Sequence, residues 1–246
     1  MNTFLGVDLG WYGKPTGLAS ISLEGPELRL RNIVRLETRL QTFDEILGWI
    51  QTEAGHGSAV AAVDAPLVIP NQTGIRLAER ELNRDYRRFH AGCHAANLGR
   101  PFARNVMAFS RRLQELGFGH GANMQPRQEG RFQIEIHPHA ATVSLFALPR
   151  IVKYKRGLRE ARANELRRLR TLALTHLPKG DPPLSLRLPA IPSTGSTKPV
   201  EDQIDAVLCA YIGAYWWFWG TRRNTLYGSQ AEGYIVVPHF LPGAAS

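Results

Sequence analysis

The strongest constraint on the fold is a short run of small apolar residues, Ser58 to Val63 (SAVAAV). A nearly continuous apolar run of this length is typical of a strand that is buried on both faces of its sheet. Such a strand is reached through a crossover connection, and the preceding residues, 43–55, carry apolar side chains at helical spacing. The pattern therefore predicts a parallel strand that follows a crossover helix.

Three strands are expected before that helix. Residues 2–9 form an apolar run, residues 17–23 (GLASISL) alternate after a turn, and residues 28–36 alternate between apolar and largely basic positions. Closely spaced alternating segments of this kind favour consecutive antiparallel strands. The first part of the chain is therefore expected to have the order β-β-β-α-β.

The rest of the chain is less regular. Residues 66–130 are polar, arginine-rich and loop-like, which indicates an insertion after the fourth strand, and residues 178–199 are rich in Pro, Ser and Thr, which indicates a long loop or mobile segment. The other expected elements are helices at 77–89, 104–116, 140–148, 156–176 and 199–219, and strands at 131–136 and 233–237, the last of them an edge strand.

The composition fits one domain, residues 1–246, with a basic surface. The formal net charge is +9, and the hydrophobic fraction of 43% is sufficient for a packed core. A basic chain favours a polyanionic partner such as a nucleic acid or a nucleotide. The sequence has no membrane-spanning run and no signal-peptide pattern, so we expect a cytoplasmic protein that does not enter a membrane. The oligomeric state is left open.

Two carboxylates follow apolar strands. Asp8 lies in FLGVDLG and Asp64 lies in VAAVDAPL. Ligands of open α/β sheets bind near the carboxyl ends of strands, and neighbouring strands are about 4.8 Å apart, so these two side chains can share a cation if their strands are adjacent. Each could also cap or initiate a turn. Their common position favours a metal site for Mg²⁺ or Mn²⁺, which prefer oxygen ligands.

Further carboxylates are available from other elements. Asp202 and Asp205 are three residues apart near the start of the last helix, so they lie on nearly the same helix face. Glu135 lies in FQIEIHP, where alternation permits either face of the sheet. Three or four carboxylates can support a two-metal hydrolysis of a phosphodiester. The expected catalytic set is Asp8, Asp64, Asp202, Asp205 and Glu135, with the four aspartates as metal ligands.

The motifs GVDLG, VDAPL, IEIHPHAA and EDQIDAVLCAY resemble the ribonuclease H-like superfamily. More narrowly, GVDLGWYGKPTG, DAPLVIPNQTGIRLAERELNRDYRRFHAGCHAANL and GYIVVP resemble the domain of unknown function 429 family, whose members are predicted to be nucleases of the RNase H fold. This resemblance implies a mixed five-stranded sheet flanked by helices, in the order β-β-β-α-β-α-β-α. It also implies metal-binding carboxylates at Asp8, Asp64 and Asp205, with Asp202 as an additional ligand, as in RuvC-type resolvases.

Several basic residues are candidates for contact with a nucleic acid, either DNA or RNA. Arginines recur at helical spacing beside Tyr86 and Phe89, and a second basic stretch begins near Lys153. A solvated, ion-paired surface is the alternative. The proposed substrate-binding residues are Lys14, Arg76, Arg80, Arg87, Lys153, Lys155 and Arg156.

His90, Cys93 and His94 have a spacing that zinc could use, but no second cysteine pair completes a tetrahedral site. A catalytic Cys93 is equally weakly supported, and a substrate-facing loop is the favoured interpretation of this segment. The role of His137, which follows Glu135 closely, stays open between proton transfer and structure.

The predicted function is a metal-dependent nuclease. One alternative is an ATP-dependent phosphotransferase of the actin, Hsp70 and sugar-kinase superfamily, because the chain begins with a GxDxG hairpin in which Lys14 and Thr16 could contact phosphate. Against it, the chain has no adjacent Gly-Gly pair for an adenosine loop and barely enough residues for two such domains. A non-catalytic nucleic-acid-binding protein is the third possibility.

Overall fold

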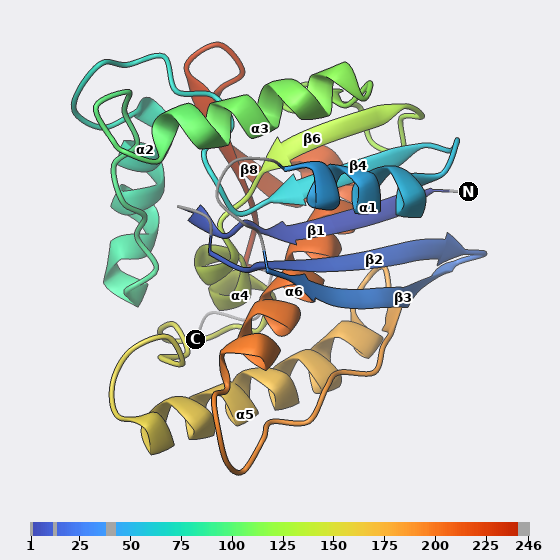
Figure 1. Cartoon of the computed structure of the whole chain (residues 1–246), viewed down its shortest axis with the longest axis vertical. Helices are drawn as coiled ribbons and strands as arrows, with labels where there is room; N and C mark the ends of the chain where they lie inside the picture. Colours follow the sequence, from blue (N-terminus) through green and yellow to red (C-terminus); the bar gives the residue numbers. More distant parts are fainter. Residues whose placement is uncertain (1, 12–13, 38–42, 241–246) are drawn as a thin grey trace.

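A mixed sheet of seven strands forms the centre of the molecule (Figure 1). The computed structural model describes residues 2–11, 14–37 and 43–240. The strand order is β5-β6-β4-β1-β2-β3-β7. The strands are β1 (Thr3–Asp8), β2 (Thr16–Glu24), β3 (Glu27–Leu36), β4 (Ala59–Val63), β5 (Gly119–His120), β6 (Arg131–Glu135) and β7 (Leu184–Ser185).

Five of the six strands that the sequence predicts are contiguous in this sheet. β1, β2 and β3 are antiparallel neighbours, and β4 and β6 extend the sheet from β1 in parallel orientation. The predicted mixed sheet and the order β-β-β-α-β of its first part are therefore confirmed. The edge strands β5 and β7 were not predicted, because two residues are too few for a periodic pattern.

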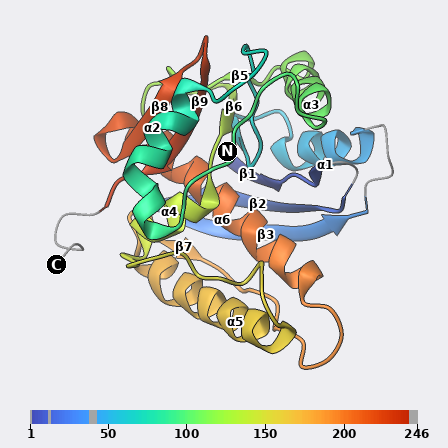
Figure 2. The same ribbon diagram turned by 90° about the vertical axis from the view of Figure 1, so that its left-hand side faces the viewer.

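Helices cover both faces of the sheet. α6 crosses one face, α5 lies outside α6, and α1 and α3 lie on the opposite face (Figures 1 and 2). The helices are α1 (Asp44–Ala54), α2 (Leu77–Tyr86), α3 (Ala103–Glu115), α4 (Pro138–Leu145), α5 (Arg159–His176) and α6 (Lys198–Trp219). Of the described helices, none is long and apolar enough to cross a membrane.

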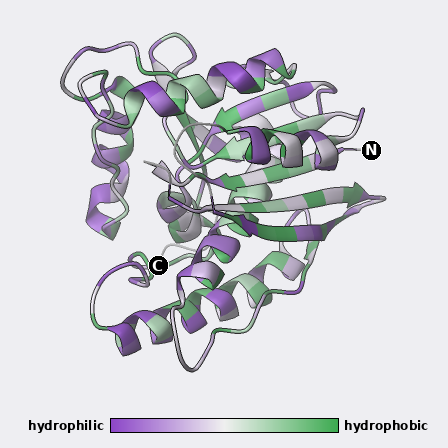
Figure 3. Ribbon diagram, viewed as in Figure 1, coloured by the Kyte–Doolittle hydropathy of each residue, from purple (hydrophilic) through white to green (hydrophobic). Residues whose placement is uncertain are grey.

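Close contact between α6 and the sheet depends on small residues. A Cβ atom on Gly6 of β1 would lie 1.9 Å from the carbonyl oxygen of Ala206, and one on Gly17 of β2 would lie 2.1 Å from that of Asp202. Only a glycine permits this approach of backbones. Figure 3 shows mainly hydrophobic residues on the central strands, whereas α5 carries many hydrophilic ones. The tight fit brings the first turns of α6 against the ends of β1 and β2.

The segment between β4 and β6 contains α2, the short 3-10 helix η2 (Arg87–Phe89), α3 and β5. Residues 178–197 include the end of the 3-10 helix η3 (Leu177–Lys179) and the two-residue strand β7 and are otherwise irregular. The predicted domain limits and the mobility of that loop stay predictions.

The last predicted strand belongs to a second sheet. β9 (Gly233–Pro238) pairs with β8 (Asn224–Ser229) in a two-stranded antiparallel hairpin. A single bridge between Ile136 and Val236 joins this hairpin to the residue that follows β6. β9 is thus an edge strand, as predicted, but it belongs to this separate hairpin, and its partner β8 was not predicted. The hairpin also packs against α2.

Candidate active site

Asp8 and Asp64 lie side by side at the carboxyl ends of adjacent parallel strands. The register pairs Val7 of β1 with Val63 of β4, and the Asp64 amide donates a hydrogen bond of 2.9 Å to the Val7 carbonyl oxygen. Each aspartate is therefore one residue beyond a paired valine. The condition for a shared site, that the first and fourth strands are neighbours, is therefore met.

Both aspartates belong to the set of strand positions that faces α6. Side chains alternate across a strand, and Gly6 and Ala62, two residues before Asp8 and Asp64, both lie against α6. The intervening Val7 and Val63 pack in the core on the other face, beside α1 and α3. Alternation therefore directs Asp8 and Asp64 toward the helix that carries Asp205.

The electrostatic environment shows that these carboxylates are close. Burial raises the pKa of Asp8 well above its usual value; Lys155 opposes this shift, and Asp205, Asp64 and Asp202 add to it. Burial likewise raises the pKa of Asp64 to about 6; Lys155 lowers this pKa, whereas Asp205 and Glu135 raise it. A site that raises the pKa of several carboxylates in this way is typical of functional centres.

Asp205 is buried on α6 and meets two residues of one loop. The Tyr154 hydroxyl donates a hydrogen bond of 2.7 Å to its Oδ1, and the Lys155 ammonium lies 2.9 Å from its Oδ2. Oδ2 nevertheless has no partner in hydrogen-bond geometry among the described residues. Burial opposes the charge of Lys155, but the attraction of Asp205, Tyr154, Asp8 and Asp64 raises the pKa of Lys155 well above its usual value. Lys155 is therefore the positive charge that the three carboxylates share.

Asp202 makes different contacts. Its Oδ2 accepts a hydrogen bond of 2.9 Å from Arg35 of β3, and its Oδ1 lies 2.7 Å from the Lys198 ammonium in the first turn of α6. Both oxygens are thus ion-paired. Asp202 still contributes to the negative potential at Asp8, so it lies beside the other carboxylates with its charge already compensated.

Glu135 lies on the opposite face of the sheet from Asp8 and Asp64. It pairs with Val63 in the register of β6 and β4, so alternation directs it away from α6. Both of its oxygens accept hydrogen bonds from Arg76, at 2.5 and 3.0 Å, and the Leu67 amide donates a third bond of 3.0 Å. These hydrogen bonds connect β6 to the segment after β4.

Arg76, one of the predicted substrate-binding residues, is buried and is not part of an exposed basic surface. Arg76 is 3% exposed, and its guanidinium also donates to Glu79 at 2.8 Å and to the Val68 carbonyl oxygen at 2.7 Å. Helical spacing alone placed it with Arg80 and Arg87, which are exposed. Arg76 differs because it stands in the N-cap position of α2, where the chain enters the helix against β6.

The donor set of Asp8, Asp64 and Asp205 suits a hard divalent cation. All potential ligands are carboxylate oxygens, and one buried oxygen of Asp205 has no hydrogen bond within the part of the chain that the structure describes. Among those residues, no group of three or more His, Cys, Asp or Glu is already spaced to hold a metal ion. Lys155 supplies the compensating charge instead, so cation binding requires this side chain to move.

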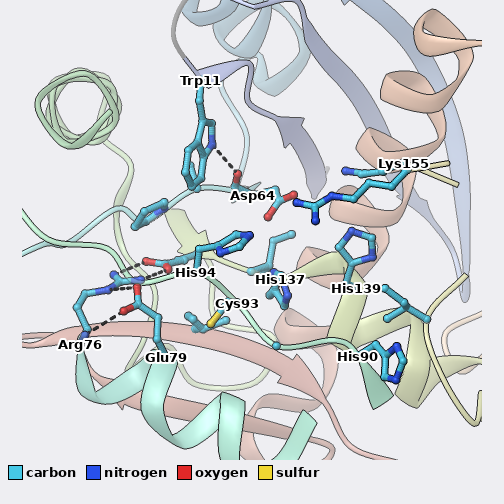
Figure 4. A pocket seen from close by; sticks show the side chains of 18 of the residues that line it. Trp11, Asp64, Arg76, Glu79, His90, Cys93, His94, His137, His139 and Lys155 are labelled. Atoms are coloured by element: carbon cyan, nitrogen blue, oxygen red, sulfur yellow. Dashed lines mark hydrogen bonds and ion pairs between the residues drawn. The ribbon is translucent and has the colours of Figure 1, made fainter. Parts of the chain in front are cut away.

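A cavity of about 680 Å³ opens beside Asp64 (Figure 4). Its walls come from the ends of β4 and β6, from the loop after η2, and from the loop between α4 and α5. Trp11 stands over the Asp64 backbone, and its indole N–H donates a hydrogen bond of 3.3 Å to the Asp64 carbonyl oxygen. Residues from seven separated segments, including α2 and β9, therefore surround one space next to the carboxylates.

The histidines and the cysteine of the sequence motifs line this cavity. His90, Cys93, His94, His137 and His139 all face it. Burial raises the pKa of the Cys93 thiol to about 12, so Cys93 is protonated at neutral pH and is a poor nucleophile. Burial lowers the pKa of His137 to about 4 and that of His139 well below its usual value. Both imidazoles are therefore neutral near pH 7.

The remaining predicted substrate-binding residues are distributed around the site. Lys153 and Arg156 are exposed and line the cavity with Lys155. Lys14 is exposed on the connection between β1 and β2. Arg80 and Arg87 are exposed on α2 and η2 but are not among the residues that line the cavity.

Some site residues were missed by sequence reasoning. Tyr154 contacts Asp205 from a loop 51 residues earlier, and Trp11, Ile151, Val152 and Ile235 line the cavity. Loop and hairpin residues of this kind have no periodic signal, and only the packing of distant segments brings them together. The hydrophobic character of the cavity could not be inferred from any one motif.

A family model described as "Protein of unknown function (DUF429)" matches residues 6–232. A solved structure of RuvC from T. thermophilus in complex with a Holliday junction substrate is similar to this chain, with 12% sequence identity and a TM-score of 0.34; the match covers 87% of this chain and 96% of that one. No curated protein matches the sequence significantly.

Proposed function

This chain belongs to the DUF429 family, and we propose that it is a metal-dependent nuclease that hydrolyses phosphodiester bonds of a nucleic acid in the cytoplasm. The observation that carries the proposal is the convergence of Asp8, Asp64 and Asp205 from β1, the end of β4 and α6. Burial and the mutual repulsion of these carboxylates raise the pKa of Asp8 and Asp64. A bound Mg²⁺ or Mn²⁺ would compensate the negative charge of the ionised carboxylates.

In this proposal the three aspartates hold one or two divalent ions. When bound, such ions activate water and stabilise the leaving oxygen of a phosphodiester. Asp202 has a supporting role, because Arg35 and Lys198 already compensate its charge. Glu135 acts as a structural residue that anchors the wall of the cavity through Arg76.

Residues of the loop between α4 and α5 would control access to the carboxylates. Tyr154 orients Asp205 through its hydrogen bond, and Lys155 compensates the carboxylates before a cation enters. Lys153 and Arg156 lie on the same loop at the cavity and are placed to contact phosphate oxygens. The net charge of +9 supports attraction of a polyanion to this surface.

The phosphotransferase alternative has little support in the fold. The described residues contain one mixed sheet of this kind, whereas the alternative superfamily requires two such domains around its nucleotide. The Thr16 hydroxyl, an expected phosphate contact in that reading, is buried and accepts a hydrogen bond of 3.0 Å from the Gly10 amide. No observation favours it over hydrolysis.

The test is cleavage of labelled single-stranded, duplex and branched DNA and RNA with Mn²⁺, for the wild type and for Asp8→Asn and Asp205→Asn. We expect cleavage by the wild type and a loss of at least 100-fold in each variant. Asp44→Asn, an exposed aspartate at the start of α1, is the matched control. Cleavage that survives both site substitutions, or wild-type protein that binds nucleic acid equally in EDTA and never cuts it, would exclude the proposal.

A second readout is independent of activity. Mn²⁺ should raise the thermal midpoint of the wild type, because a ligand that binds only the folded state stabilises it. The increase should be absent in Asp8→Asn and retained in Asp44→Asn.

A further inference from the structure

We infer that the cavity beside Asp64 receives one nucleotide unstacked from its strand, with the base inside and the phosphate at the loop of Lys153 to Arg156. This inference rests on the proposed function, because it takes the ligand to be a nucleic acid. It adds a substrate class: single-stranded, frayed or extruded nucleotides rather than fully stacked duplex.

The size and walls of the cavity suit a base. Its volume of about 680 Å³ falls in the range of roughly 300–1,000 Å³ that is typical of small-molecule pockets. Ile151, Val152 and Ile235 contribute apolar surface, and Trp11 contributes an aromatic ring. Trp11 packs on Phe102 with 4.3 Å between ring centroids, which holds the indole in place. A fixed aromatic ring beside apolar side chains is a typical stacking surface for nucleobases.

Charged Arg76, Glu79 and Glu135 line the cavity but are paired with one another, and other polar groups in the lining suit an uncharged ligand. His137 and His139 are neutral because of burial, and the Cys93 thiol is protonated. His137 Nε2 lies 3.2 Å from the Ala91 carbonyl oxygen, which fixes the orientation of this ring. Neutral imidazoles provide hydrogen-bond donors and acceptors that match the edges of a base. They provide no charge for a buried phosphate.

Positive charge is concentrated on one side of the cavity. Lys153, Lys155 and Arg156 come from the same loop, and Lys155 lies close enough to Asp64 to influence its pKa. Figure 4 shows Asp64 and Lys155 on the same side of the cavity, with His137 and His139 near them and Cys93 beyond. A nucleotide bound with its base toward His94 and Cys93 would leave its phosphate beside these cations and the carboxylates.

This arrangement does not suit a base that stays in a duplex. A paired and stacked base cannot enter a pocket unless it leaves the stack, which costs free energy. Substrates that present an unpaired nucleotide avoid this cost, so they are expected to bind best.

The test is calorimetric titration of the full chain in EDTA with adenosine 5′-monophosphate, cytidine 5′-monophosphate and inorganic phosphate. We expect each nucleotide to bind at least tenfold more tightly than phosphate. Trp11→Leu should weaken nucleotide binding roughly tenfold, in line with the contribution of one base–aromatic stack, while Trp49→Leu on α1 should leave it unchanged. Arg156→Ala should weaken nucleotides and phosphate alike, with exposed Arg150→Ala as its control.

Equal affinity for nucleotides and phosphate, or equal affinity of the Trp11→Leu and Trp49→Leu variants, would overturn the inference. Thermal midpoints of all four variants establish that they are folded. These titrations need neither metal nor hydrolysis. Nucleotide binding without Mn²⁺-dependent cleavage would therefore contradict the nuclease proposal but not nucleotide binding in the cavity. Cleavage without nucleotide binding would contradict nucleotide binding in the cavity but not the nuclease proposal.

Discussion

The ammonium nitrogen of Lys155 lies 2.9 Å from Oδ2 of Asp205. The two residues are on different elements, a loop after α4 and the long helix α6. Asp8 and Asp64 also attract this ammonium, so one lysine compensates three carboxylates. A positive side chain at this place compensates the carboxylates without a metal ion, and under the proposed function it would compete with a divalent cation for the same oxygens.

Replacement of Lys155 tests this competition. In EDTA, Lys155→Met should lower the free energy of unfolding by about 1–2 kcal/mol, since the carboxylates lose their counter-charge while the partial exposure of Lys155 limits the effect. The concentration of Mg²⁺ needed for half of its stabilising effect should fall. Denaturant unfolding at several Mg²⁺ concentrations measures both, with exposed Lys153→Met as control. Unchanged stability in EDTA would refute the role given to Lys155.

The neutral state of His137 predicts acid sensitivity. Its pKa is lowered from 6.5 to about 4 by burial, with Lys155 and His94 also disfavouring the charge. Between these values the unfolded state binds a proton that the folded state does not, so stability falls as the pH falls from 6.5 toward 4. Between pH 7.5 and 5, the free energy of unfolding of His137→Gln should therefore fall by about 1–2 kcal/mol less than that of the wild type.

Denaturant unfolding at both pH values measures this difference. His56→Gln changes an exposed histidine between α1 and β4 and should follow the wild type. An identical pH dependence for His137→Gln and wild type would show that His137 is not the source of the sensitivity.

The buried pairing of Arg76 with Glu135 and Glu79 predicts a large cost for its removal. Arg76→Met should reduce the free energy of unfolding by about 3–5 kcal/mol, because two carboxylates with nearly no exposure lose their cation. Adding Glu135→Gln should restore part of the loss. Arg80→Met, an exposed arginine on the same helix, should change stability by less than about 0.5 kcal/mol. Equal effects of the two single substitutions would contradict this account.

Gly6 lies so close to α6 that its position has no room for a side chain. Gly6→Ala should destabilise the protein by more than about 2 kcal/mol, because its Cβ would lie 1.9 Å from the Ala206 carbonyl oxygen. Gly48→Ala is a matched control on α1, because its Cβ would meet no atom within 4 Å. The higher helix propensity of alanine should increase the free energy of unfolding by about 0.5–1 kcal/mol. Thermal and denaturant unfolding measure whether each substitution lowers or raises the free energy of unfolding. An unchanged free energy of unfolding for Gly6→Ala would show that the helix can shift without cost.

Periodicity in the sequence was sufficient for the main elements. β1 to β4, β6 and the long helices all lie within a few residues of the expected ranges, because each has enough residues to show a repeat of 2 or 3.6. The short strands β5 and β7 and the hairpin partner β8 lacked such a signal. Their formation depends on the neighbours that supply hydrogen bonds.

Alternation determined the site only in part. The sequence by itself placed Asp8 and Asp64 at the ends of apolar strands, and the structure showed that these strands, β1 and β4, are adjacent. Only the tertiary structure decided that Glu135 faces the other side with a buried Arg76 and that Lys155 reaches Asp205. The physical reason is that strand and helix periods report local geometry, whereas the side of the sheet a residue faces and the partner of a buried charge depend on segments far apart in the chain.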